Sequence, residues 1–179
     1  MTIVARIEAI ELLERGHRRV AEQIDGIDTV DLERPATIGG GDWSAKDLVG
    51  HLAAWEREAL RALERWRLGR RPHIEDVFAD GAPAVDRLNA ETAARTSALP
   101  LDAVLIDAEQ THAALIEAMR RLDDDAWIER APYETRGREA PTLAEMLGGI
   151  TGAPGANFDH ASAHLASLEA FRASVRPGD

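Results

Sequence analysis

Apolar residues recur every three or four positions along four long stretches of the chain, residues 3–27, 44–68, 101–122 and 142–171. The second stretch shows this spacing most clearly, at Leu48, Leu52, Trp55, Ala59, Leu63 and Trp66. A period of 3.6 residues gathers such positions on one face of a helix. The pattern therefore predicts four amphipathic helices, each with an apolar face that the others must cover.

Glycine, proline and polar residues separate these stretches, so residues 25–41 and 123–141 are predicted to be loops. A short extra helix is predicted over residues 84–97, between the second and third main helices. Four amphipathic helices joined by loops favour an all-α fold, a four-helix bundle. We expect one domain over residues 1–175 and a flexible tail over residues 176–179.

Two places along the chain carry helix-boundary signals. Ser44 is a plausible N-cap for the second helix, and Asp47 stands three residues later, in the capping-box position. In the last stretch, Pro154 lies within a run rich in glycine and proline, residues 148–155. Since proline removes a backbone donor and obstructs the preceding turn, we predict a long last helix that kinks or breaks near Pro154.

Composition supports a helical domain, because 45% of the residues are hydrophobic and only 4% are aromatic. Alanine, leucine, glutamate and arginine, which are good helix formers, dominate. The formal net charge of −11 repels phosphate backbones and argues against nucleic acid as a partner. The one basic cluster is interpreted as a solvated helix end, where cations suit the helix dipole; it consists of Arg65, Arg67, Arg70 and Arg71.

The chain contains no cysteine, which excludes disulfides, thiolate zinc sites and cysteine nucleophiles. Any metal ion must be held by His, Asp, Glu, Asn or backbone groups. Residues 1–13 lack the apolar core of a signal peptide, and no apolar run reaches the length of a membrane span. The sequence therefore predicts a cytoplasmic protein with no membrane partner.

Three of the six histidines are the leading candidates for chemistry. His160 and His164 are four residues apart, which on a helix places both imidazoles on one face, where they can share a metal ion. His51 lies in the apolar part of the second helix, where an unpaired polar group costs about 1–3 kcal/mol. Facing helices of a bundle often supply metal ligands. Three neutral imidazoles leave coordination positions open, as catalytic sites do, so we predict a metal centre at these histidines.

The other candidates have several interpretations. His17 and His112 fall on apolar stripes, so each can be a second-shell partner, a fourth ligand or a core histidine with a satisfied hydrogen bond. His73 lies in a loop and is predicted to be exposed. Asp47 and Asp159 can orient metal ligands, or can be a capping residue and a solvated carboxylate respectively.

Two segments carry a resemblance to a known family. Residues 42–55, DWSAKDLVGHLAAW, resemble the second-helix signature of the DinB/YfiT-like superfamily, a W-S-x-x-D-x-x-x-H-L pattern. Residues 158–165, FDHASAHL, resemble its last-helix H-x-x-x-H motif. Within the superfamily the chain is most similar to the ClbS/DfsB-like branch, because of the pair Leu88 and Asn89 and the aromatic-containing loop at residues 133–138.

The resemblance implies a four-helix bundle with a divalent metal ion, most often zinc or nickel, bound by His51, His160 and His164. It also implies activities known in the superfamily, namely thiol-dependent transferases and isomerases and metal-dependent hydrolases, and it implies a homodimer. ClbS-like members act on reactive small molecules and protect the producing cell. ClbS itself has tyrosine at the position of His51, so its tyrosine-based chemistry does not transfer to this chain.

The functional prediction is a metal-dependent hydrolase or thiol transferase that adds water or a thiol to a small electrophilic molecule, in detoxification or self-resistance. Trp55 and Tyr133 are predicted to contact the substrate. The candidates for a general base are Asp47, Asp159 and Glu56, and none of them stands out. The sequence names neither the substrate, nor the physiological metal, nor a thiol cosubstrate.

Two alternatives stay open at this point. One is a non-catalytic protein that binds or sequesters a hydrophobic small molecule in a bundle cavity, with Trp55, Trp66 and Tyr133 near the mouth. The other is a structural relic with an empty or opportunistic metal site. Metal content together with turnover discriminates between them.

Overall fold

The computed structural model describes residues 3–39, 41–135 and 139–175. Within these ranges the backbone is helical or irregular, and the only β-type pairings are two isolated bridges. The all-α prediction is confirmed. The helices are α1 (Arg6–Ile24), α2 (Thr29–Leu32), α3 (Ala45–Arg67), α4 (Ile74–Ala79), α5 (Ala82–Ser97), α6 (Leu101–Arg120), α7 (Asp124–Ile128), α8 (Leu143–Ile150) and α9 (Ser162–Val175).

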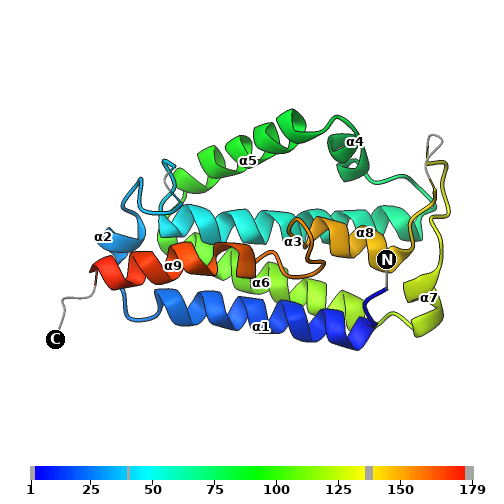
Figure 1. Cartoon of the computed structure of the whole chain (residues 1–179), viewed down its shortest axis with the longest axis horizontal. Helices are drawn as coiled ribbons and strands as arrows, with labels where there is room; N and C mark the ends of the chain where they lie inside the picture. Colours follow the sequence, from blue (N-terminus) through cyan, green and yellow to red (C-terminus); the bar gives the residue numbers. More distant parts are fainter. Residues whose placement is uncertain (1–2, 40, 136–138, 176–179) are drawn as a thin grey trace.

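Three long helices and one divided helix make the bundle. Figure 1 shows α1, α3 and α6 running along the long axis, while α8 and α9 follow one another in the position of a fourth member. Helix α3 packs against α5, α6 and α8, and α1 packs against α6 and α9. No helix of the described residues has both the length and the apolar character needed to cross a membrane.

The structure adds helices to the four expected ones. Residues 74–79 form α4 in a segment that looked irregular in sequence, and α5 begins at Ala82, before the start expected for the extra helix. Gly81 separates the two helices with a φ of 79°, and Pro83 occupies the first turn of α5, where its missing N–H is tolerated. Single turns, α2 and α7, lie within the two predicted loops. The predicted tail, residues 176–179, lies outside the described residues.

Two hydrophobic clusters fill the bundle along its length. One cluster gathers around Trp55, Leu63 and Met119, and the other around Leu48 and Leu168. The clusters meet on α3, because neighbouring turns of this helix contribute to each. His51 lies in that part of α3 and is itself buried, with 4% of its surface exposed.

Helix α5 approaches α3 closely at Gly50, next to His51. A Cβ at Gly50 would lie 2.4 Å from Cγ2 of Thr96, which is buried. We expect Gly50→Ala to lower the free energy of unfolding by about 1–3 kcal/mol through overpacking. The matched control is Gly149→Ala in α8, where an added Cβ meets no atom within 4 Å.

The control substitution should stabilise the protein by about 0.5–1 kcal/mol, since alanine suits a helix interior better than glycine. Urea unfolding of both variants and of the unmodified chain measures the difference. Equal unfolding midpoints for the two variants would show that α5 does not press on α3 at this point.

Candidate metal centre

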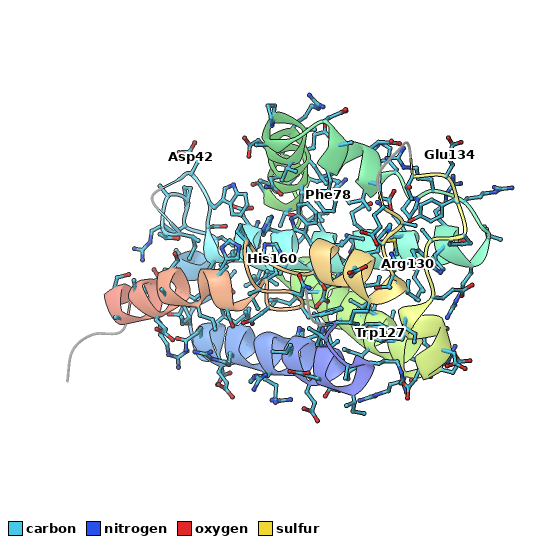
Figure 2. All side chains as sticks on the ribbon, turned by 45° about the vertical axis from the view of Figure 1, so that its right-hand side comes forward. Asp42, Phe78, Trp127, Arg130, Glu134 and His160 are labelled. Atoms are coloured by element: carbon cyan, nitrogen blue, oxygen red, sulfur yellow. The ribbon has the colours of Figure 1, made fainter. Side chains whose placement is uncertain are left out.

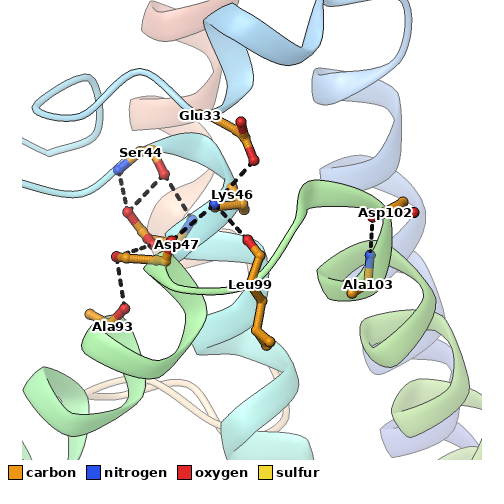
Figure 3. Close-up of polar contacts among 9 residues, drawn as sticks. Glu33, Ser44, Lys46, Asp47, Ala93, Leu99, Asp102 and Ala103 are labelled. Atoms are coloured by element: carbon orange, nitrogen blue, oxygen red, sulfur yellow. Dashed lines mark hydrogen bonds and ion pairs between the residues drawn. The ribbon is translucent and has the colours of Figure 1, made fainter.

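The first turn of α3 is fixed by a capping box, which positions His51 in the following turn. The Asp47 amide donates to Ser44 Oγ over 3.1 Å, and the Ser44 amide donates to Asp47 Oδ2 over 2.9 Å. Ser97, at the end of α5, donates its hydroxyl to the other carboxylate oxygen of Asp47 (Figure 3). The predicted N-cap is confirmed. Asp47 is therefore a capping residue, and its carboxylate is engaged away from the imidazoles.

Lys46, beside this box, is buried and ties three segments together. Its ammonium group donates to the Glu33 carboxylate over 3.1 Å and to the Leu99 carbonyl over 2.8 Å (Figure 3). A buried ammonium with such partners holds the loop before α3 and the end of α5 against the start of α3. The helix that carries His51 is thus anchored at its N-terminus from two sides.

The other two histidines come from the place where the last helix is interrupted. Residues 151–161 are not helical, so His160 precedes α9 and His164 lies in its first turn. The break near Pro154 is confirmed, but the expectation that both imidazoles share one helical face is wrong. Phe158, buried and with a φ of 59°, turns the chain before His160, a conformation that local sequence disfavours and tertiary packing holds.

The three imidazoles nevertheless converge. His51 Nε2 lies 3.2 Å from His160 Nε2, and His164 Nε2 lies 3.3 Å from His160 Nε2. One ring nitrogen from each histidine lies within 4.8 Å of those of the other two. The ring planes of His51 and His160 are 74° apart, so the rings point toward a common region instead of stacking. Such a group is consistent with a metal site of three ligands.

Burial keeps these imidazoles neutral. Desolvation, with smaller contributions from the two neighbouring histidines, lowers the pKa of His51 from 6.5 to about 3. Desolvation and the charge of His164 lower the pKa of His160 to about 4, and desolvation also lowers the pKa of His164. Each ring therefore offers an unprotonated nitrogen at neutral pH, and neutral imidazole is the form that ligates zinc and similar ions.

Aromatic rings pack against two of the three imidazoles. Nδ1 of His51 and Nδ1 of His160 are buried without a hydrogen-bond partner among the described residues. Trp43 packs against His51 with 4.8 Å between ring centroids, and Trp55 packs against His160 at 6.0 Å. Asp159, the other candidate for orienting a ligand, makes no hydrogen bond to a described residue. Indole rings are thus the described neighbours of these two imidazoles, where the histidine ligands of metal ions usually have a hydrogen-bond acceptor.

Trp55 forms one wall beside the histidines. Its indole N–H donates to Asn89 Oδ1 over 3.1 Å, and its ring stacks on Phe78 with centroids 6.0 Å apart. Figure 2 labels Phe78 above His160, on the side of α4. The Asn89 that carried part of the family resemblance therefore has a structural role, since it fixes the tryptophan beside the imidazoles.

The two aromatic residues of the loop before α8 are packed into the protein. The Tyr133 hydroxyl donates to Glu75 over 2.5 Å, and its ring meets Trp66 edge-on at 5.6 Å. Burial and the Glu75 contact raise the pKa of Tyr133, so its hydroxyl stays protonated. Trp127 is 2% exposed and donates to the Val4 carbonyl. Substrate contact by Tyr133 stays a prediction, and residues 136–138 of this loop lie outside the described residues.

The remaining pair of apolar-stripe histidines forms a separate cluster. The rings of His17 and His112 stack in parallel with centroids 4.0 Å apart. His17 Nε2 lies 2.8 Å from Glu109, and His112 Nδ1 lies 3.0 Å from Glu56. Both imidazoles thus have a hydrogen-bond partner, as the interpretation as core histidines requires. Neither belongs to the three-histidine group, and His73 is exposed as predicted.

The sequence profile of the DinB superfamily matches residues 12–152, which include His51 and the capping box of α3. This chain belongs to the DinB superfamily. The matched region ends before His160 and His164, so the meeting of all three ligands rests on the geometry given above. No curated protein sequence matches the chain.

Several solved structures share the fold of this DinB-superfamily protein. An uncharacterised protein from Escherichia coli UTI89 is 14% identical with a TM-score of 0.71, covering 97% of this chain and 96% of its own. The colibactin self-resistance protein ClbS, solved with double-stranded DNA, is 17% identical with a TM-score of 0.69, covering 92% and 95%. At these identities the likeness establishes the fold and nothing finer.

A mycothiol-dependent maleylpyruvate isomerase has the same fold over part of its length. It is 20% identical with a TM-score of 0.65, and the match covers 94% of this chain and 63% of the isomerase. The present chain thus spans less than two thirds of that enzyme. Any transfer of the isomerase's activity is a matter for proposal.

Proposed function

We propose that this protein is a metal-dependent enzyme that adds water or a thiol to a small electrophilic molecule. The observation that carries the proposal is the convergence of three neutral imidazoles, from His51, His160 and His164, within 4.8 Å of one another. Three protein ligands are the number found in catalytic zinc sites, which keep a position for water or substrate. A purely structural site would present four.

Zinc or nickel is the ion we assign to the site. Imidazole nitrogens suit both, whereas magnesium and calcium prefer oxygen ligands. When bound, such an ion supplies Lewis acidity, which either lowers the pKa of water toward about 7 or polarises the electrophile. The chain itself supplies the ligands and the surrounding indole rings, which exclude bulk water from one side of the imidazoles.

The relatives support the choice of reaction without fixing it. One neighbour is named as a thiol-dependent isomerase and another as a self-resistance protein, so a reactive small molecule is a reasonable substrate. We propose a detoxification or self-resistance role on this basis, which is an argument from fold-level analogy. Glu56 is held by His112 and Asp47 by the capping box, which leaves Asp159 as the remaining acidic candidate for a general base.

The second candidate function is binding without catalysis. A cavity of about 470 Å³ between α1, α3 and α6 favours it, because cavities of this size accept drug-sized molecules. Trp55 lines this cavity, whereas Trp66 and Tyr133 do not. We retain this candidate as the alternative to the enzyme.

The test combines metal content with turnover on two simple reactions. Untagged protein is analysed by elemental mass spectrometry and assayed for hydrolysis of p-nitrophenyl acetate and for addition of a thiol to N-ethylmaleimide. We expect about one metal ion per chain and a rate that disappears in His164→Ala but persists in His17→Ala.

The two failures have different meanings. Protein that takes up no zinc or nickel at micromolar concentrations would end the metal proposal. Protein that holds the metal tightly but accelerates neither reaction would put the binding function first.

We also propose that the protein is a cytoplasmic homodimer. The dimer is argued from the family resemblance alone, which is an associational argument. Light scattering that gave a monomer mass at high micromolar concentration would contradict it.

A further inference from the structure

A cavity of about 470 Å³ that is partly open to solvent lies between α1, α3 and α6. Apolar side chains dominate its wall, among them Leu13, Val20 and Leu105. At one end it reaches Phe158 and His160, and at the other it reaches residues 25–27, at the end of α1. It thus runs along the inside of the bundle and approaches the three-histidine group from the side of the core.

The charged groups on this wall are all of one sign. Glu56, Glu109 and Asp25 line the cavity, and neither lysine nor arginine occurs among its described lining residues. Arg57, from the same turn of α3 as Glu56, is turned away and pairs with Asp107. The cavity therefore combines an apolar wall with carboxylates, and its described lining includes no lysine or arginine to pair with them.

The stacked histidines hold two of these carboxylates in place. His112 lies 3.0 Å from Glu56, and His17 lies 2.8 Å from Glu109, with the two imidazole rings 4.0 Å apart. Since each carboxylate is fixed through a ring on a neighbouring helix, neither has to be reorganised when a ligand arrives. Preorganised charge of this kind favours binding, because less ordering has to accompany it.

We propose that this cavity binds an apolar molecule that carries one protonated amine. The hydrocarbon part occupies the space between α1, α3 and α6, and the ammonium group lies against Glu56 and Glu109. A carboxylate or phosphate in the same place would face side chains of its own sign, and the repulsion would be strongest at Glu56, whose side chain is only 15% exposed. A neutral molecule would gain the apolar contacts without the ion pair.

This inference goes beyond the proposed enzymatic function and does not depend on a metal ion. A molecule bound in the cavity would lie beside His160, but its affinity would come from the wall and from the two carboxylates. Binding to the cavity and binding of metal are therefore separate measurements on the same protein.

The experiment compares three probes with the same chain and different head groups, decylammonium, decanol and decanoate. Binding to the full-length protein is followed by isothermal titration calorimetry and by the fluorescence of Trp55 and the other tryptophans. We expect the cation to bind at least about tenfold more tightly than decanol, and decanoate to bind more weakly than both.

Two kinds of variant test whether the probes bind in this cavity. The double variant Glu56→Gln and Glu109→Gln should weaken the cation at least about tenfold and leave decanol nearly unchanged. Glu11→Gln is its control, because Glu11 is exposed on α1 and does not line the cavity. Leu105→Trp and Ala108→Leu fill the space and should weaken the cation and decanol alike.

Circular dichroism establishes which of the two filling variants are folded. If Leu105→Trp does not fold, the comparison is made with Ala108→Leu. Decanoate binding as tightly as the cation would overturn the proposal. Unchanged cation affinity in the double variant, or in a folded filling variant, would also overturn it. Metal content, measured in parallel, separates the two proposals: cation binding without metal would leave only the enzyme proposal unsupported, and metal without cation binding would overturn only this one.

Discussion

Replacing His160 with alanine is expected to abolish tight metal binding. His160 stands between the other two imidazoles, with its Nε2 3.2 Å from His51 and 3.3 Å from His164. Its removal leaves only His51 and His164, whose ring centroids are 5.3 Å apart, and two protein ligands are fewer than the three that a catalytic zinc site uses. We expect the dissociation constant for zinc to rise by more than about a hundredfold, beyond the effect of losing a second-shell partner.

Competition with a chromophoric chelator measures this change, and His17→Ala is the matched control. His17 is also a partly buried histidine, but it belongs to the stacked pair with His112. Its variant should bind zinc as the unmodified protein does. If His160→Ala and His17→Ala retained equal affinity, the three-histidine group would not be the metal site.

Metal-free protein should lose stability steeply as the pH falls below about 6.5. In the folded state the pKa of His51 is about 3 and that of His160 about 4, whereas both are near 6.5 in the unfolded chain. Between these values the unfolded chain binds more protons, so acid favours unfolding. Each of the two histidines lowers the free energy of unfolding by about 1.4 kcal/mol per pH unit below 6.5, so the two together lower it by about 4 kcal/mol at pH 5.

Urea unfolding in the presence of a chelator, from pH 8 to pH 5, measures this loss. The variant His51→Gln cannot take up the proton and should show about half of the decrease between the same pH values. Both proteins contain the same carboxylates, so comparing the pH dependence of their free energies of unfolding removes the contribution of the carboxylates. Identical slopes for the two proteins would mean that His51 is accessible to protons in the folded state.

The second main helix and the burial of His51 could be predicted from sequence because the signals are local. Ser44 and Asp47 are three residues apart, and the apolar stripe that follows them has a regular period, so α3 and the burial of His51 follow from neighbouring residues. Local hydrogen bonds and periodic burial depend little on the rest of the fold.

The last helix was only half predictable. The glycines and Pro154 predicted a break in the helix. The position of His160 outside α9, however, depends on Phe158, whose positive φ is maintained by packing against Trp127. The spacing of four residues between His160 and His164 therefore predicted that the two imidazoles lie close together, but for a reason that does not hold. Proximity was restored by a turn and not by a helical face.

Predicting that His17 and His112 stack would have required the register of α1 against α6. No local sequence pattern contains this information. The sequence left three interpretations open for each residue, and the structure provides a hydrogen-bonded partner for both. The short helices α2, α4 and α7 were missed because a single turn is too short to show a period.

Because the helix is interrupted between α8 and α9, the three histidines of the candidate site lie in segments that differ in local stability. His51 belongs to a continuous helical ladder, whereas the backbone N–H of His160 relies on a single bond of 3.1 Å to the Thr151 carbonyl, outside any helix. Segments held by isolated bonds open more readily than helix interiors, without unfolding of the whole domain. An ion bound by these residues would therefore exchange at the rate at which residues 151–161 open. The lifetime of the bound ion would be set by this segment, while the affinity for the ion would be set by the three imidazoles.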